Sequence, residues 1–412
     1  MVWTRNRPLG LTHRDPEKTQ AGYTLFASVR GPCATLLDHQ GRVVHRWRLE
    51  EGIQYASLLP SGRLLVRTLP PLDAGGAERI GGSSAALVEL DWDGEVLWRY
   101  DEPFLHHDCL RLDSGNTVIA VWRKLPEGLT ERVLGGSPHP EDPERMWGDV
   151  LQEITPDGRC VWEWRSWEHL EVEAQVKCPL EDRREWTHMN SVRPGPGDDL
   201  LVSFRLTDTV ALLDRKSGAL KWSWGPGVLS HQHHATWLSG SGVDDGRVLI
   251  FDNGCHRKHG PAYSRVVEVD TASGEIVWSY QDPTVLAFFS FMVSGAERLP
   301  DGNTLITEGA TGRIFEVTSR HEVVWEYVSP FVYDSNFGPT PSIFRAHRYA
   351  ADDPRFEGRE LDPERYGELN DTIARNEFPN DPPSETMLLL MEAARAAKRE
   401  REERERAARK GA

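Results

Sequence analysis

A tight turn followed by a strand that ends in tryptophan recurs along the chain. Clear copies lie at 93–98, 157–162, 217–222, 273–278 and 321–325, and a related copy at 40–47 has its tryptophan displaced. The copies recur every ~45 to 65 residues, a period that is typical of β-propeller blades with loop insertions and too long for most helical solenoids. Each copy is therefore predicted to form a β-hairpin.

A second repeat alternates with the first. It reads Leu-Pro-Ser-Gly or a close variant at 59–65, 112–118 and 299–305. Glycine and asparagine tolerate the positive φ of tight turns, so these segments also predict hairpins between alternating apolar strands. Two hairpins make one four-stranded blade, and the sequence thus predicts an all-β, six-bladed β-propeller.

The last blade lacks a strand of its own. Its inner strand is predicted at 341–347, but no copy of the second repeat follows, whereas 22–27 near the N-terminus supplies a suitable strand. We expect this N-terminal strand to close the ring, which removes the exposed edges of an open array. The predicted organisation is an N-terminal arm (1–21), the propeller (22–350) and a C-terminal extension (351–412) that ends in a charged helix.

The sequence does not decide the roles of the two insertions and the C-terminal helix, or the oligomeric state. Insertions at 125–148 and 166–185 interrupt the repeat, and long loops on a rigid ring often cover its mouth. The C-terminal helix is interpreted as a solvated tail, with docking on the ring or on a partner as the alternatives. A homo-oligomer is also possible.

The recurrent tryptophans are interpreted as structural. Their fixed place one strand after a turn suits packing between neighbouring blades better than ligand stacking. These residues are Trp98, Trp162, Trp222, Trp278 and Trp325.

Composition excludes several classes of partner. With 48 Lys and Arg against 64 Asp and Glu, the net charge of −16 disfavours nucleic acid. No segment approaches the ~20 apolar residues of a membrane span, and the first residues lack the apolar run of a signal peptide. The five cysteines are spread without a CxxC pair, so we expect no disulfide framework and a cytoplasmic protein.

Histidines mark the predicted inner strands of three successive blades. The segments 106–110, 188–192 and 233–237 each begin with histidine, and inner strands line the central channel of a propeller. We therefore expect His106, His188 and His233 to converge, with His107 and His234 beside them in an orientation that the sequence leaves open. Burying several imidazoles together costs desolvation free energy, so their recurrence indicates a functional site.

Other polar residues extend this predicted site. Arg205, in the next strand of the middle blade, suggests an anionic ligand, because guanidinium pairs with sulfate, phosphate or carboxylate. Asn190 and His234 are predicted to contact the substrate. Further candidates, for which a place in a loop or at the rim is the simpler interpretation, are His231, His256, His259 and His347, together with Asp252 and Asn253 after the strand that follows His233. The chain contains no GxSxG, P-loop, HExxH or GxGxxG motif that would indicate another chemistry.

The segments 185–192, 201–205, 211–218, 232–233, 251–254 and 295–306 resemble the bacterial arylsulfate sulfotransferase family, over roughly residues 22 to 331. The resemblance implies a six-bladed propeller that moves a sulfuryl group from a phenolic sulfate ester to another phenol, without a nucleotide donor or other cofactor. It implies that His233 is the nucleophile that becomes sulfated. It also implies that His188, Arg205, His106 and His107 bind and stabilise the sulfate oxygens. Neutral imidazole is a competent nucleophile near neutral pH.

Two other functions remain open at this point. His106, His188 and His233 could bind a divalent transition metal for a hydrolase, lyase or oxygenase, since three imidazoles leave an open coordination position. Alternatively, the ring could be a non-enzymatic scaffold that uses the charged C-terminal helix to bind a partner.

Overall fold

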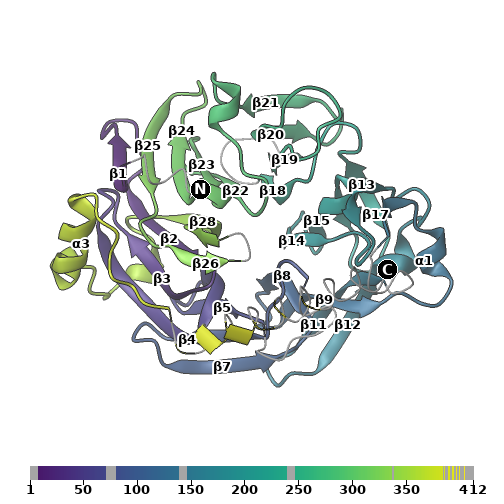
Figure 1. Cartoon of the computed structure of the whole chain (residues 1–412), viewed down its shortest axis with the longest axis horizontal. Coiled ribbons are helices and arrows are strands. Elements are labelled where there is room, and N and C mark those ends of the chain that lie inside the picture. The colour runs from purple at the N-terminus through teal and green to yellow at the C-terminus, as the bar shows by residue number, and fades with distance from the viewer. Residues whose placement is uncertain are drawn as a thin grey trace.

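Antiparallel sheets make up most of the computed structural model, which describes residues 8–70, 80–138, 146–238, 246–335 and 338–383 and isolated positions of the C-terminal tail. Figure 1 shows the sheets arranged around a common centre, with β8, β14, β18, β22 and β28 nearest to it. Three sheets have four strands each. They are β8 (Leu105–Arg111), β9 (Thr117–Lys124), β11 (Trp147–Ile154) and β12 (Cys160–Arg165); β14 (Met189–Pro194), β15 (Leu200–Phe204), β16 (Thr209–Leu213) and β17 (Leu220–Trp224); and β18 (His233–Leu238), β19 (Arg247–Asp252), β20 (Arg265–Asp270) and β21 (Ile276–Tyr280).

Two larger sheets complete the arrangement. The five-stranded sheet has β1 at one edge and β22 at the other, and the seven-stranded sheet runs from β28 through β2 to β7. The first contains β1 (Gly10–Arg14), β22 (Gly295–Arg298), β23 (Thr304–Glu308), β24 (Arg313–Val317) and β25 (Val323–Val328). The second contains β2 (Gly22–Ser28), β3 (Gly31–Leu37), β4 (Val43–Leu58), β5 (Leu64–Thr68), β6 (Ala86–Leu90), β7 (Val96–Asp101) and β28 (Ile343–Ala350).

The seven-stranded sheet consists of two four-stranded groups that share β4. The first half of β4 pairs with β3, its second half pairs with β5, and Gly52 between them has a φ of 76°. A positive φ suits glycine, which has no Cβ to clash with the following carbonyl. The pairing predicted between the N-terminal strand and the last inner strand is present, since Phe26 of β2 lies opposite Ala346 of β28.

The tryptophans of the outer strands join neighbouring groups of strands. Each donates its indole N–H to a backbone carbonyl in a turn of the following sheet or, for Trp47, of the other half of its own seven-stranded sheet, at 2.8–3.1 Å. The pairs are Trp47 with Asp91, Trp98 with Pro156, Trp162 with Arg215, Trp224 with Gly274, Trp278 with Ser319 and Trp325 with His39. In the third copy Trp224 takes this role two residues after Trp222, which packs partly buried in the same cluster.

Apolar side chains fill the space between neighbouring sheets. Leu151 of β11, Val192 of β14 and Val202 of β15 are fully buried in one such cluster, and similar clusters lie between the other sheets. Burial of this kind supplies most of the folding free energy. It also holds the inner strands rigidly in place.

The insertions and the C-terminal segment add small elements. These are α1 (Leu129–Arg132), α2 (Ser166–His169) and α3 (Gly367–Ala374), the strand pairs β10 (Gly135–Ser137) with β13 (Lys177–Asp182) and β26 (Tyr333–Ser335) with β27 (Gly338–Thr340), and 3-10 turns at Arg205–Thr207, Val285–Ala287, Gly309–Thr311, Pro354–Phe356 and Pro363–Tyr366. Each insertion contributes one strand of the parallel β10–β13 pair.

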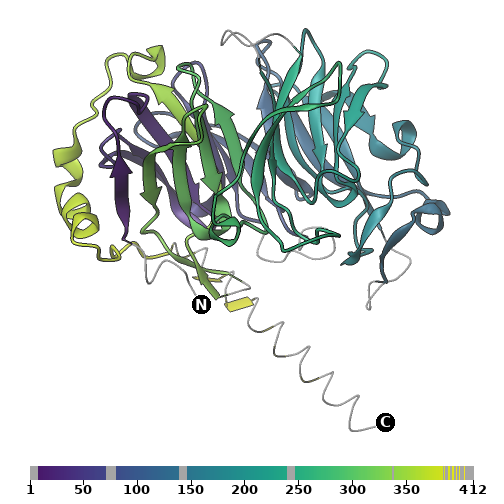
Figure 2. The same cartoon turned by 90° about the horizontal axis from the view of Figure 1, so that it is seen from above.

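Both terminal segments pack on the outside of the ring. β1 extends the sheet of β25, and Figure 2 shows α3 beside it. Ile373 of α3 is buried in the same cluster as Tyr327, and Phe356 is buried against Trp92. The predicted charged helix beyond residue 383 lies mostly outside the described residues. Within the described part, no helix is long and apolar enough to cross a membrane.

Candidate functional site

Three neighbouring inner strands begin with a bulge at their histidines. The register shifts between His106 and Cys109 in β8, between Met189 and Ser191 in β14, and between His233 and Ala235 in β18. His107, His188 and His234 have φ values of 45°, 56° and 46°. Left-handed non-glycine residues cost about 1–3 kcal/mol each and cluster at functional sites, where bulges redirect side chains. Their repetition at one end of three strands indicates such a site.

His107, rather than His106, contacts His188. The centroids of the His107 and His188 rings lie 4.2 Å apart. The His107 ring also packs so closely on Gly82 that a Cβ there would lie 2.2 Å from it, so glycine is required. Burial and the neighbouring charge of His188 lower the pKa of His107 well below its usual value.

His106 instead packs within its own sheet. Its ring stacks on Trp122 at 4.2 Å, its Nε2 lies 3.3 Å from Asp149, and its Nδ1 lies 3.1 Å from Nδ1 of His107. His106, His188 and His233 were expected to occupy equivalent positions of their strands and to converge. The bulges shift the strands relative to one another, so His106 does not lie beside His188. His106 thus contacts His107 and not His188, whereas His107 packs against the ring of His188.

Two carboxylates, those of Glu185 and Asp149, contact His188 and the residues on either side of it. Nδ1 of His188 lies 2.8 Å from Glu185, and Asp149 accepts hydrogen bonds from the hydroxyl of Thr187 and, at 2.9 Å, from the backbone N–H of Met189. Both acids are buried. Burial raises the pKa of Asp149 to about 6. Asp149 therefore orients the strand start from which His188 projects.

His233 has a defined tautomer. The amide nitrogen of Asn253 donates to the carbonyls of Ser290 at 2.7 Å and Val293 at 3.1 Å, so its oxygen faces His233. Nδ1 of His233 lies 2.7 Å from that oxygen and must carry the hydrogen. Nε2 is left with the lone pair. Burial, followed by the charge of Arg205, lowers the pKa of His233 well below its usual value.

Arg205 and Asn190 lie close to this histidine. Arg205 follows β15, and its Nη1 donates to Glu181 at 3.0 Å. The amide nitrogen of Asn190 donates at 2.7 Å to the carbonyl of Gln232, the residue before His233. The Oδ1 atom of Asn190 is buried and, among the described residues, has no hydrogen-bond partner. Asn190 thus offers a free acceptor.

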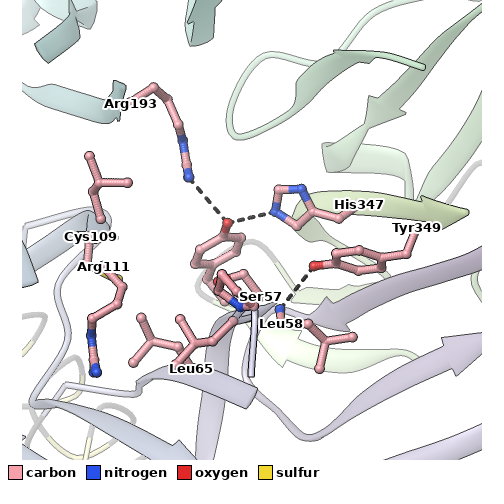
Figure 3. Close-up of a pocket in the computed structure, with 12 residues that line it drawn as sticks. Ser57, Leu58, Leu65, Cys109, Arg111, Arg193, His347 and Tyr349 are labelled. Carbon is pink, nitrogen blue, oxygen red and sulfur yellow. Dashed lines mark hydrogen bonds between the residues drawn. The ribbon is translucent and has the colours of Figure 1, made fainter. Parts of the chain in front are cut away.

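A second polar network joins residues of the inner strands β8, β14 and β28 with Tyr55 of β4. Asp108 accepts from Arg193 at 2.7 Å and from Arg345 at 3.3 Å, and Arg193 also donates to the Tyr55 hydroxyl at 3.2 Å. Tyr55 lies 2.7 Å from Nε2 of His347 (Figure 3). His234 lies beside this network, with its ring 6.4 Å from that of His347.

A pocket of about 210 Å³ opens at this network rather than at His233. Its polar lining includes Tyr55 and, as Figure 3 shows, Ser57, Arg111, Arg193, His347 and Tyr349. The lining includes none of the histidines at 106, 107, 188, 233 and 234. His347, which the sequence suggested as a rim residue, is instead largely buried in this network.

His347 is expected to make stability depend on pH. Burial alone lowers its pKa, but Tyr55 and Glu297 outweigh burial and raise the pKa to about 9 from 6.5. A histidine whose pKa is higher in the folded than in the unfolded protein stabilises the fold at pH values below its unfolded pKa. This contribution, roughly 3 kcal/mol, is lost as the pH rises from about 6.5 to about 9. Urea unfolding of His347→Gln across this range should therefore show a flatter pH dependence than the wild type. Parallel curves for the two proteins would contradict this assignment.

The structure brings most of the predicted residues together and adds others. His107, His188, His233, Arg205 and Asn190 surround one end of β14 and β18. Three of the partners that orient them, Glu185, Asp149 and Glu181, were not predicted as site residues. Asn253 was among the further candidates, and its contact with His233 reveals its role.

The predicted metal ligands do not form a metal-binding group. Within the described ranges, one set of histidine, cysteine and acidic residues has ligand atoms close enough to share an ion, and it consists of Cys178, His231 and His256. His106, His188 and His233 are not among them.

A family model described as Arylsulfotransferase (ASST) matches residues 13–228 and 225–329. A crystal structure of a protein of unknown function from Bacteroides caccae has 14% sequence identity, a TM-score of 0.50, and coverage of 80% of this chain and 99% of its own. This similarity concerns the fold alone.

Two further solved structures have lower scores. A streptogramin B lyase is 12% identical with a TM-score of 0.44, covering 83% of this chain and 93% of its own. The virginiamycin B lyase of Staphylococcus aureus is 12% identical with a TM-score of 0.42, covering 78% and 87%. No curated protein sequence matches the chain.

Proposed function

The chain belongs to the arylsulfotransferase family, and we propose that it moves a sulfuryl group from a phenolic sulfate ester to a phenol through a sulfohistidine at His233. The observation that carries this proposal is the hydrogen bond of 2.7 Å between His233 and Asn253. It leaves the lone pair on Nε2, and the lowered pKa keeps the ring neutral near neutral pH. A neutral, oriented imidazole is the form that attacks sulfur.

The proposed reaction has two steps. Nε2 of His233 attacks the sulfur of the donor, an N–S bond forms, and the S–O bond to the aryl group breaks to release a phenolate. The oxygen of the acceptor phenol then attacks the same sulfur and the N–S bond breaks. The proton lost by the acceptor balances the one gained by the released phenolate. Histidine is regenerated, and no cofactor enters either step.

The surrounding residues are assigned roles in this proposal. Arg205, His107 and His188 bind the sulfate oxygens, because fixed donors stabilise the negative charge that spreads over the transferring group. His106 supports His107 through their contact of 3.1 Å. Asn190 offers its unpaired Oδ1 to the hydroxyl of the acceptor phenol, and His234 lies next to the nucleophile.

We also infer that the sheets are six blades of a closed propeller. Dividing the seven-stranded sheet at Gly52 yields six groups of four strands, with β1 added to one of them. The tryptophan bonds described above link each group to the next and return from Trp325 to His39. The β2–β28 pairing supports the same closure, because it joins the two ends of the chain.

The reaction can be tested with p-nitrophenyl sulfate as donor. We expect p-nitrophenol release to depend on an added phenol, and the sulfated phenol to appear in equal amount. Without acceptor, intact-mass analysis should show the protein heavier by one SO₃ group. Release that is equally fast without a phenol would indicate hydrolysis, and no release with any phenol would contradict the proposal.

Asn253 is expected to act as a positioning residue for His233. Without its acceptor oxygen, Nδ1 no longer holds the hydrogen in place, so Asn253→Ala should lower kcat by about 100-fold with little change in KM for the donor. The control is Asn303→Ala, which removes another buried, hydrogen-bonded asparagine, one that bonds Glu316 instead. Equal losses in the two variants would show that general destabilisation explains the effect.

A further inference from the structure

Four side chains with metal-binding atoms converge beside the proposed active site. Cys178 and Glu181 come from β13 in the second insertion, His231 precedes β18, and His256 follows β19. Nε2 of His231 lies 3.0 Å from Nδ1 of His256 and 3.2 Å from Oε1 of Glu181. Nδ1 of His256 lies 3.5 Å from the sulfur of Cys178 and 3.9 Å from Oε1 of Glu181.

These separations match the edges of a metal coordination tetrahedron. Zinc binds sulfur, nitrogen and oxygen at about 2.0–2.3 Å, which places the donor atoms of a tetrahedral site about 3.3–3.7 Å apart. The separations of 3.0 Å between the two histidines and 3.5 Å between His256 and Cys178 lie close to this range. The ligand atoms of Cys178, His231 and His256 all lie within 4.8 Å of one another. A single ion can therefore reach these three donors, and the carboxylate of Glu181 lies beside the two histidines without belonging to this group.

The surroundings of His231 also suit a metal ligand. Its Nδ1 lies 3.2 Å from Oδ1 of Asp208, which also accepts at 2.7 Å from the backbone N–H of His231. A carboxylate that takes one ring hydrogen directs the other nitrogen towards the metal, as in most histidine-ligated zinc sites. The side chain of His231 is only 1% exposed, so its orientation is set by packing.

The charges balance as well. A thiolate and a carboxylate with two neutral imidazoles carry the two negative charges that neutralise a divalent ion. Arg205, which contacts Glu181 at 3.0 Å, is compensated by Asp208 on the opposite side of His231. Mixed sulfur and imidazole donors favour zinc over magnesium or calcium, which prefer oxygen.

We propose that Cys178, His231 and His256 bind one zinc ion that fastens the second insertion to the ring. Cysteine and histidine are the usual ligands of structural zinc sites, and the carboxylate of Glu181 lies next to both histidines at this site. The proposal does not depend on sulfuryl transfer. It also assigns a role to the insertion, because β13 pairs only with the short strand β10 in the described sheets.

The ion would also stabilise the proposed active site. His231 stands two residues before His233, and Glu181 holds Arg205. Removing zinc is therefore expected to loosen both the nucleophile segment and a sulfate-binding cation. Metal-free protein should keep its sheets but unfold at a lower temperature.

Elemental analysis of untagged full-length protein, grown with zinc, tests the proposal. We expect one zinc ion per chain, and a thiolate-to-cobalt charge-transfer band after exchange with Co²⁺. Cys178→Ser should lose the band, and His256→Ala should lose the zinc. The matched controls Cys160→Ser and His259→Ala replace exposed residues of the same types and should retain both.

Each outcome decides the question. Wild-type protein that binds neither zinc nor Co²⁺ while folded would overturn the proposal, as would zinc content that persists in both Cys178→Ser and His256→Ala. Folding is checked by circular dichroism in every variant. Zinc content and the cobalt band do not require turnover. The zinc proposal can therefore be contradicted while sulfuryl transfer is confirmed, and sulfuryl transfer can be contradicted while zinc binding is confirmed.

Discussion

Replacing His233 with alanine abolishes acceptor-dependent release of p-nitrophenol, with a loss of at least about 1,000-fold in kcat, because no other group supplies the nucleophile. The ring is buried and held by one hydrogen bond to Asn253, so the variant loses one contact besides its chemistry. We expect it to remain folded. The measurement is the initial rate with and without a phenol, together with intact mass after incubation with the donor alone.

The control for this prediction is His13→Ala. His13 is an exposed histidine on β1, far along the chain from the inner strands, and its loss should leave the rate unchanged. The zinc content of His233→Ala is measured as well, since the metal ligand His231 is only two residues away. A variant that still gains one SO₃ group would show that another residue, such as His188 or His107, is the nucleophile.

Replacing Asp108 with alanine should cost about 3–5 kcal/mol of the free energy of unfolding, the typical cost of breaking a buried ion pair. Asp108 is fully buried and receives hydrogen bonds from Arg193 and Arg345 and from the backbone N–H groups of Cys109 and Val192. Although burial alone lowers the pKa of Arg193, Asp108 raises it above its ordinary value. Alanine leaves two buried cations without an anion.

Urea unfolding at neutral pH measures this loss. The matched control is Glu173→Ala, which breaks an ion pair with Arg132 in which both side chains are 53% exposed. Exposed pairs are screened by water, so the midpoint of the control should not move. Equal midpoints for Asp108→Ala and the wild type would show that the polar network of Asp108 contributes nothing to stability.

The histidines show how far sequence reasoning reaches. His188 and His233 were identified because imidazoles recurred at the start of successive inner strands. The choice between His106 and His107 could not be made, because it depends on the bulge in β8 and on a left-handed residue. A shift of one residue reverses the face of a strand, and turn and bulge geometry is not encoded in the spacing.

The orienting partners were harder to predict. Asn253 lies 20 residues from His233, and Asp108 contacts Arg345 across a separation of 237 residues. No local pattern relates such positions. The same applies to the proposed zinc ligands, since Cys178 and His256 are 78 residues apart and form no CxxC or HxxxH spacing.

The sequence by itself determined the mostly β architecture and the recurrence of histidine at the inner strands, because hairpin turns, strand alternation and the recurring tryptophans are local and repeat with a regular period. Only the tertiary structure decided which side chains meet. Contacts among buried polar groups depend on how separate strands are brought together and on where each strand bulges, and both are set by packing of the whole ring.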